Sequence, residues 1–70
     1  MRYYFLVADG AGVFDDETGT DLADDNAARQ HARQIITELK EDPSFQTSDA
    51  QMIVMRDGQE IFVIPFASVP

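Results

Sequence analysis

Three short segments of this 70-residue chain are apolar on both faces of the strands that they are expected to form. They lie at residues 3–7, 52–55 and 61–66. An antiparallel strand with one face in water alternates apolar and polar residues, whereas a continuous apolar run indicates two buried faces. Only residues 25–41 have the pattern of a helix, and one helix covers only one face of a sheet. The sequence therefore predicts that a partner covers the second face.

The small size of the chain leads to the same expectation. A single domain over residues 1–70 buries only about 60% of the surface that its unfolded chain exposes, so its core is marginal. Small domains often gain stability from disulfides, a structural metal or oligomerisation. With no cysteine and one histidine, disulfides are excluded and a zinc site is disfavoured. We expect a homodimer, and exchange of the terminal hairpin about residues 44–50 is one form that it can take.

The charge of the chain disfavours several classes of partner. Five basic residues against thirteen acidic ones give a net charge of −8, which repels nucleic-acid phosphates and anionic lipids. No apolar run approaches the roughly 20 residues that span a bilayer, and the first residues do not have the pattern of a signal peptide. We expect a soluble cytoplasmic protein that binds neither nucleic acid nor membranes.

The order of the predicted elements is strand, strand, helix, strand, strand. Residues 3–7 and 12–14 form the first pair, and residues 51–56 and 59–66 form a hairpin around Asp57 and Gly58, the pair preferred in a type I′ turn. Asp24 is expected to cap the helix, which ends before Pro43. The predicted fold class is α+β, a small two-layer ββαββ domain with one antiparallel sheet and one helix.

The periodicities also predict which side chains face the core. On the helix, an apolar stripe comprises Ala28, Ala32, Ile35 and Leu39, with Ile36 at its border. Phe45 is expected to pack under the helix end. In the first strand Tyr3, Phe5 and Val7 oppose Tyr4 and Leu6, and in the last Ile61 and Val63 oppose Phe62, Ile64 and Phe66. The candidate core or dimer surface is thus Tyr3, Tyr4, Phe5, Leu6, Ile61, Phe62, Val63, Ile64 and Phe66.

The sequence predicts no catalytic, cofactor-binding or metal-binding residues. The acidic stretch at residues 9–25 does not match a calcium loop, because neither Asp15 nor Asp9 as first ligand puts glycine sixth and glutamate twelfth. His31 has no nucleophile or carboxylate at helical spacing, and we expect it at the border of the apolar stripe. The protein is therefore predicted not to be an enzyme.

The chain resembles a family of short uncharacterised alphaproteobacterial proteins, a domain of unknown function. The resemblance is carried by Arg2-Tyr3-Tyr4-Phe5, Asp9-Gly10, Asp16-Glu17-Thr18-Gly19-Thr20-Asp21-Leu22, the alanine-rich start of the helix at residues 24–28, Val54-Met55-Arg56-Asp57-Gly58 and Ile64-Pro65-Phe66. Ala23 departs from the proline that relatives often place there. The resemblance implies a bacterial origin, and it assigns no function, because the family has no established activity or catalytic residues to carry over. A weaker similarity runs to antitoxin domains that pair a small sheet with a helix.

Three functions are consistent with these observations. The first is a homodimeric, non-enzymatic protein-interaction or adaptor module. The second is an antitoxin-like or inhibitory protein that covers a basic partner, which the negative charge would suit. The third is an enzyme with a site assembled across a dimer from His31 and acidic turn residues. No arrangement of a nucleophile or metal ligands in the sequence supports it.

Overall fold

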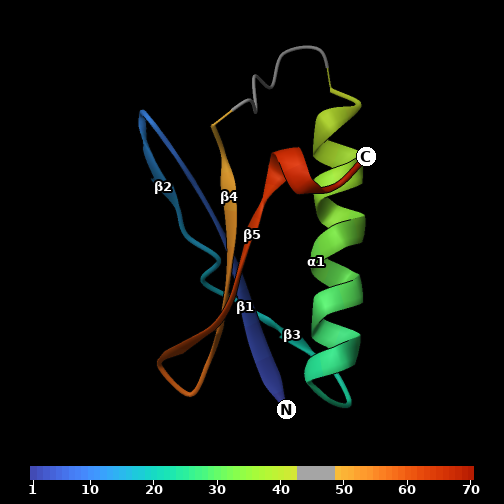
Figure 1. The fold of residues 1–70 in the computed structure, drawn as a ribbon. Helices are drawn as coiled ribbons and strands as arrows, with labels where there is room; N and C mark the ends of the chain where they lie inside the picture. The colour runs from blue at the N-terminus through green and yellow to red at the C-terminus, as the bar shows by residue number, and fades with distance from the viewer. Residues whose placement is uncertain (43–48) are drawn as a thin grey trace.

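The computed structural model describes residues 1–42 and 49–70 and shows an antiparallel sheet with one helix packed on one of its faces (Figure 1). Phe45 and residues 44–48 of the predicted hinge lie outside the described residues, whereas Ala50 at the end of that hinge is buried in the core. This two-layer arrangement confirms the predicted α+β class. In chain order the elements are β1 (Arg2–Asp9), β2 (Gly12–Phe14), β3 (Thr20–Asp21), α1 (Asp25–Lys40), β4 (Gln51–Arg56), β5 (Gln59–Pro65) and the 3-10 turn η1 (Phe66–Ser68).

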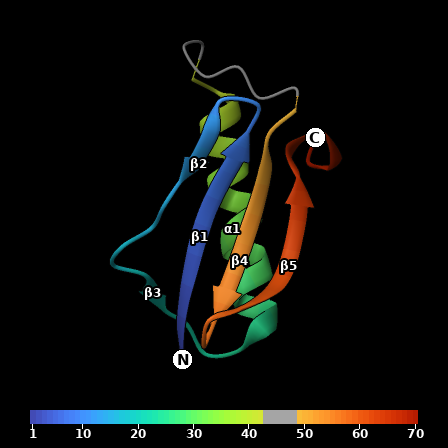
Figure 2. The same ribbon diagram turned by 90° about the vertical axis from the view of Figure 1, so that its left-hand side faces the viewer.

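β1 and β4 form the centre of the sheet, whose order is β2-β1-β4-β5 with every pair antiparallel. The short β3 also pairs with β1, where Tyr3 lies opposite Thr20. This fifth strand was not predicted, because two residues are too few to show an alternating pattern. β5 forms one outer edge of the sheet, and β2 and β3 share the other (Figure 2).

Two predicted local features, the turn between β4 and β5 and the start of α1, have the expected chemistry. Asp57 and Gly58 have φ of 54° and 76°, the positive values that a type I′ hairpin requires at both positions. At the start of α1, the Asp24 side chain accepts a hydrogen bond of 2.8 Å from the amide of Ala27, which confirms the predicted N-cap. These short-range signals depend on adjacent residues, and they were therefore accessible from sequence.

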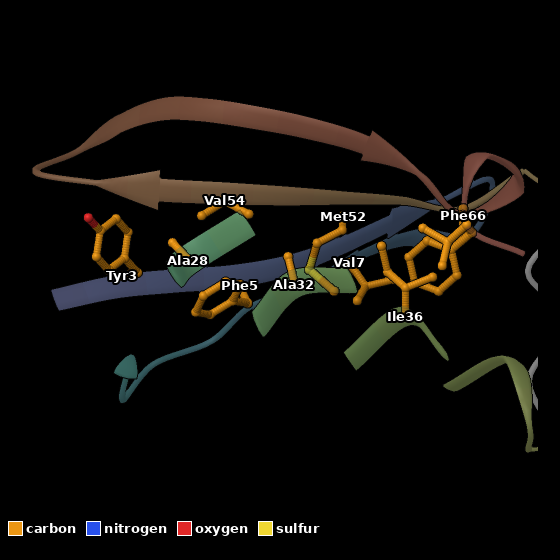
Figure 3. Packing of buried hydrophobic residues seen from close by; sticks show 11 residues of the cluster. Tyr3, Phe5, Val7, Ala28, Ala32, Ile36, Met52, Val54 and Phe66 are labelled. Carbon is orange, nitrogen blue, oxygen red and sulfur yellow. The ribbon is translucent and has the colours of Figure 1, made fainter. Parts of the chain in front are cut away.

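The core lies between α1 and the face of the sheet that carries Tyr3, Phe5 and Val7 (Figure 3). Phe66 from η1 lies at one end of it (Figure 3), and Val69, which follows η1, is also buried. Its buried side chains are Tyr3, Phe5, Val7, Ala28, Ala32, Ile36, Ala50, Met52, Val54, Phe66 and Val69.

The predicted centre of the helix stripe was wrong by one position. Ile36 is fully buried, whereas Ile35 and Leu39 are only half-buried at the margin of the core. The small side chains of Ala28 and Ala32 let the helix lie close to the sheet, and Ile36 continues the same row at a spacing of four residues. The row of closest approach is therefore set by the alanines, not by the larger side chains.

Candidate functional site

The face of the sheet opposite α1 is apolar, and none of the elements in residues 1–42 and 49–70 packs over it (Figure 2). Directly paired residues lie on the same face of a sheet. Leu6 pairs with Ile53, which pairs with Val63, and Tyr4 pairs with Met55 in the next row. We call these five side chains the open face. They come from three adjacent strands and form one continuous surface.

The open face is accessible in the single chain. Val63 is 47% exposed, and the other four members are half-buried. Successive side chains of β1 and β4 point to opposite faces of the sheet. Those that do not face the core therefore lie on the open face. Soluble monomers seldom expose contiguous apolar patches of more than a few hundred Å².

A hollow of about 330 Å³ lies at one end of the open face. Tyr4, Leu6 and Met55 supply its apolar wall, and the loop between β2 and β3 supplies acidic side chains at residues 15–17. The surface thus combines an apolar floor with a negative border. This arrangement suits an apolar or basic partner better than an acidic one.

Asp16 holds the acidic loop against the edge of β1. Its carboxylate accepts hydrogen bonds from the amides of Phe5 at 3.1 Å and Gly19 at 3.0 Å. Phe5 lies in the part of β1 between the residues that pair with β2 and those that pair with β3. Asp16 therefore satisfies an edge amide that neither β2 nor β3 pairs, and its role is structural. Asp15 and Glu17 are exposed beside it.

The structure divides the predicted core or dimer residues between the two faces. Tyr3, Phe5 and Phe66 are buried in the core under the helix. Ile61, Phe62 and Ile64 are half-buried and pack against that core. Tyr4, Leu6 and Val63 lie on the open face, where sequence analysis did not include their neighbours Ile53 and Met55. Strand pairing shows that Ile53 and Met55 belong to this face. In the sequence, the continuous apolar run at residues 52–55 was the signal that could have indicated this.

A polar network near the first turn of α1 joins this helix to β1 and β4. The buried Tyr3 donates its hydroxyl hydrogen to Asp25 Oδ1 over 2.7 Å, and Arg56 makes an ion pair with the same oxygen. The hydrogen bond from Arg56, supported by the one from Tyr3, lowers the pKa of the Asp25 carboxyl. Burial and the neighbouring carboxylate raise the pKa of the Tyr3 hydroxyl. These opposite shifts keep the network in its ion-paired form at neutral pH.

His31 lies at the border of the helix stripe, as predicted, and is half-buried. Its ring contacts the Phe5 ring edge-on, with 4.9 Å between centroids. Within the part of the chain that the structure describes, no three acidic or histidine side chains form a group that could hold a metal ion. No helix in residues 1–42 and 49–70 is long and apolar enough to cross a membrane.

Fold and surface together define a small α+β domain with an apolar sheet face left open beside an acidic loop. The chain belongs to the family described as Domain of unknown function (DUF6894), whose sequence pattern matches residues 2–67. The match covers nearly all of the chain and confirms the family resemblance seen in the sequence. Searches of curated proteins and of solved structures give no match.

Proposed function

We propose that this domain is a non-enzymatic protein-interaction or adaptor module that acts as a homodimer joined through the open face. The observation that carries this proposal is the continuous row of Leu6, Ile53 and Val63 across three strands. Face-to-face packing of two such surfaces would bury apolar side chains in the manner of a sheet sandwich. It would also give a small core the added burial that it otherwise lacks.

A pair of lysine substitutions tests this proposal. Val63→Lys places a charge on the open face, and Phe14→Lys places one on another exposed apolar residue, in β2. The two residues are 47% and 59% exposed in the single chain, so both variants are expected to fold. Phe14 pairs with Val7, a core residue, and so lies on the opposite face of the sheet from Val63.

The expected result is a wild-type mass of twice 7.8 kDa by light scattering after size exclusion. Val63→Lys should weaken the dimer by about tenfold or more, because a charge would be buried at the interface. Phe14→Lys should leave the dimer intact. A wild-type mass of one chain at rising concentration, or equal loss in both variants, would reject the open face as the interface.

The acidic border of the open face favours a second candidate function, an inhibitory or antitoxin-like module that covers a basic protein. Asp15 and Glu17 stand beside the apolar hollow, where they would attract lysine or arginine side chains at its rim. The double variant Asp15→Asn with Glu17→Gln should then lose a basic partner captured from the native organism. Glu38→Gln on the exposed helix surface is the control. Retention of the same basic protein by the double variant would reject this candidate.

A further inference from the structure

A second groove lies between α1 and β5, at the edge of the sheet that β5 forms. Arg29 and Arg33 line it from the helix, and residues 62–65 and Ser68 line it from the strand and the turn that follows. Its volume is about 180 Å³, which is smaller than the roughly 300 Å³ of the smallest usual small-molecule sites. The groove therefore suits a few side chains of a peptide better than a cofactor.

The charge of this groove is opposite to that of the molecule. The chain has five basic residues and a net charge of −8, yet two of the five line this groove. Arg2 and Arg56 form ion pairs with Asp21 and Asp25, and Lys40 donates to the carbonyls of residues 66 and 69.

The two arginines of the groove are not neutralised by the described part of the chain. The Arg29 guanidinium lies 4.8 Å from the centre of the Phe62 ring, a stacking that leaves its N–H edges free to bind a carboxylate. Neither Arg29 nor Arg33 makes an ion pair with any residue in 1–42 or 49–70. A ligand that enters the groove therefore meets two available positive charges.

The groove also borders the open edge of the sheet. Among the strands that the structure describes, β5 pairs with β4 alone, and the amide of Phe66 donates to the carbonyl of Ala50 over 3.0 Å. Because hydrogen-bonding direction alternates along an antiparallel pair, the amides of Phe62 and Ile64 point toward β4 and that of Val63 points outward. Proline at 65 has no amide hydrogen, and its carbonyl accepts the Ser68 hydroxyl at 2.7 Å. The edge is therefore available at Val63 and closed just beyond it.

We propose that this groove binds an extended segment of a partner protein that adds to β5 as a strand and places acidic side chains beside Arg29 and Arg33. The backbone of such a segment would pair with Val63. Side chains on the helix side of the added strand would lie next to Phe62 and Ile64, below the two arginines. Negative charge over the rest of the molecule disfavours the binding of acidic segments elsewhere. The two arginines therefore determine both which kind of segment binds and where it binds.

Two short peptides test this inference. One is a blocked heptapeptide of alternating valine and glutamate, and the other has lysine in place of glutamate. The glutamate peptide is expected to bind and to shift the NMR signal of the Val63 amide, whereas the lysine peptide should not bind. Arg33→Gln should weaken binding by about fivefold, the contribution of one favourable ion pair. Gln34→Glu makes the same change in net charge at the next helix position and should have a smaller effect.

Val63→Pro tests the added strand, because it removes the outward amide hydrogen at a position where an edge strand tolerates proline, and it should weaken binding of the glutamate peptide. Val63 also lies on the open face, so Arg33→Gln is the variant that separates this proposal from the proposed homodimer. Arg33→Gln should leave the mass in solution unchanged, because it lies away from the open face. Equal binding of both peptides, no binding, or signals that shift at Leu6 and Ile53 instead of Val63 would overturn the proposal. Displacement of the peptide by a short single-stranded RNA at lower concentration would assign the groove to nucleic acid and overturn it as well.

Discussion

Two glycines with nearly the same backbone conformation lie in very different surroundings. Gly19 has φ of 73° and Gly58 has φ of 76°. A Cβ atom on Gly19 would lie 2.9 Å from the Tyr3 carbonyl oxygen, whereas one on Gly58 would meet nothing within 4 Å. Gly58→Ala should cost about 1 kcal/mol, from the left-handed conformation alone. Gly19→Ala should cost more, because the chain must also move away from β1. Urea denaturation measures both, and equal losses would contradict this account.

At the same scale, the lowered pKa of the Asp25 carboxyl predicts that the stability of the fold depends on pH. Its pKa is lower in the folded chain than in the unfolded one, so it stabilises the fold above about pH 3.9, its usual pKa. That contribution is lost as the pH falls through the lowered pKa, where the folded form also becomes protonated. Asp25→Asn should thus be less stable than wild type at neutral pH, and the gap should shrink toward pH 2.

Denaturation at fixed protein concentration across this pH range measures the gap. Asp15→Asn is the control for the change in net charge, since Asp15 is exposed on the acidic loop. A gap for Asp25→Asn that is constant from pH 7 to pH 2 would show that the ion pair with Arg56 contributes no pH-dependent stability.

At the scale of elements, one carboxylate replaces a missing strand partner. Asp16 accepts the Phe5 amide in the part of β1 between β2 and β3. Asp16→Ala leaves that amide and the amide of Gly19 without this acceptor, and it should cost about 1–3 kcal/mol. Asp15→Ala, one residue away and exposed, should change stability by less than about 0.5 kcal/mol. Similar losses in the two variants would show that the loop is not fixed through Asp16.

The same elements show what the sequence could reveal. The hairpin at Asp57 and Gly58 and the cap at Asp24 were predicted, because their chemistry depends on neighbours within three residues. The network of Tyr3, Asp25 and Arg56 was not, since its members are 22 and 31 residues apart and meet only after β1, α1 and β4 pack. The buried side of the helix was predicted in part. Periodicity identified the apolar stripe, whereas packing against the sheet determined that Ile36 is its buried centre.

At the scale of the whole molecule, residues 1–42 and 49–70 form a sheet with two apolar faces and one helix, which covers one of those faces (Figure 1). The sequence predicted this surplus from the apolar runs, and the structure places its members on the open face of three strands. The groove beside β5 was not predicted, because Arg29 and Arg33 are ordinary exposed helix residues until β5 lies beside them. Surfaces assembled from distant segments are the part of the site that a single sequence conceals.

The most direct test of the dimer is the detection of contacts between methyl groups of two differently labelled chains by isotope-filtered NMR. We expect intermolecular contacts among the methyl groups of Leu6, Ile53 and Val63, which form the central row of the open face. Methyl groups of Val7 and Ile36 serve as the internal control, because both lie in the core under the helix and should show contacts only within one chain. Intermolecular contacts confined to other surfaces, or none at millimolar concentration, would contradict the central claim.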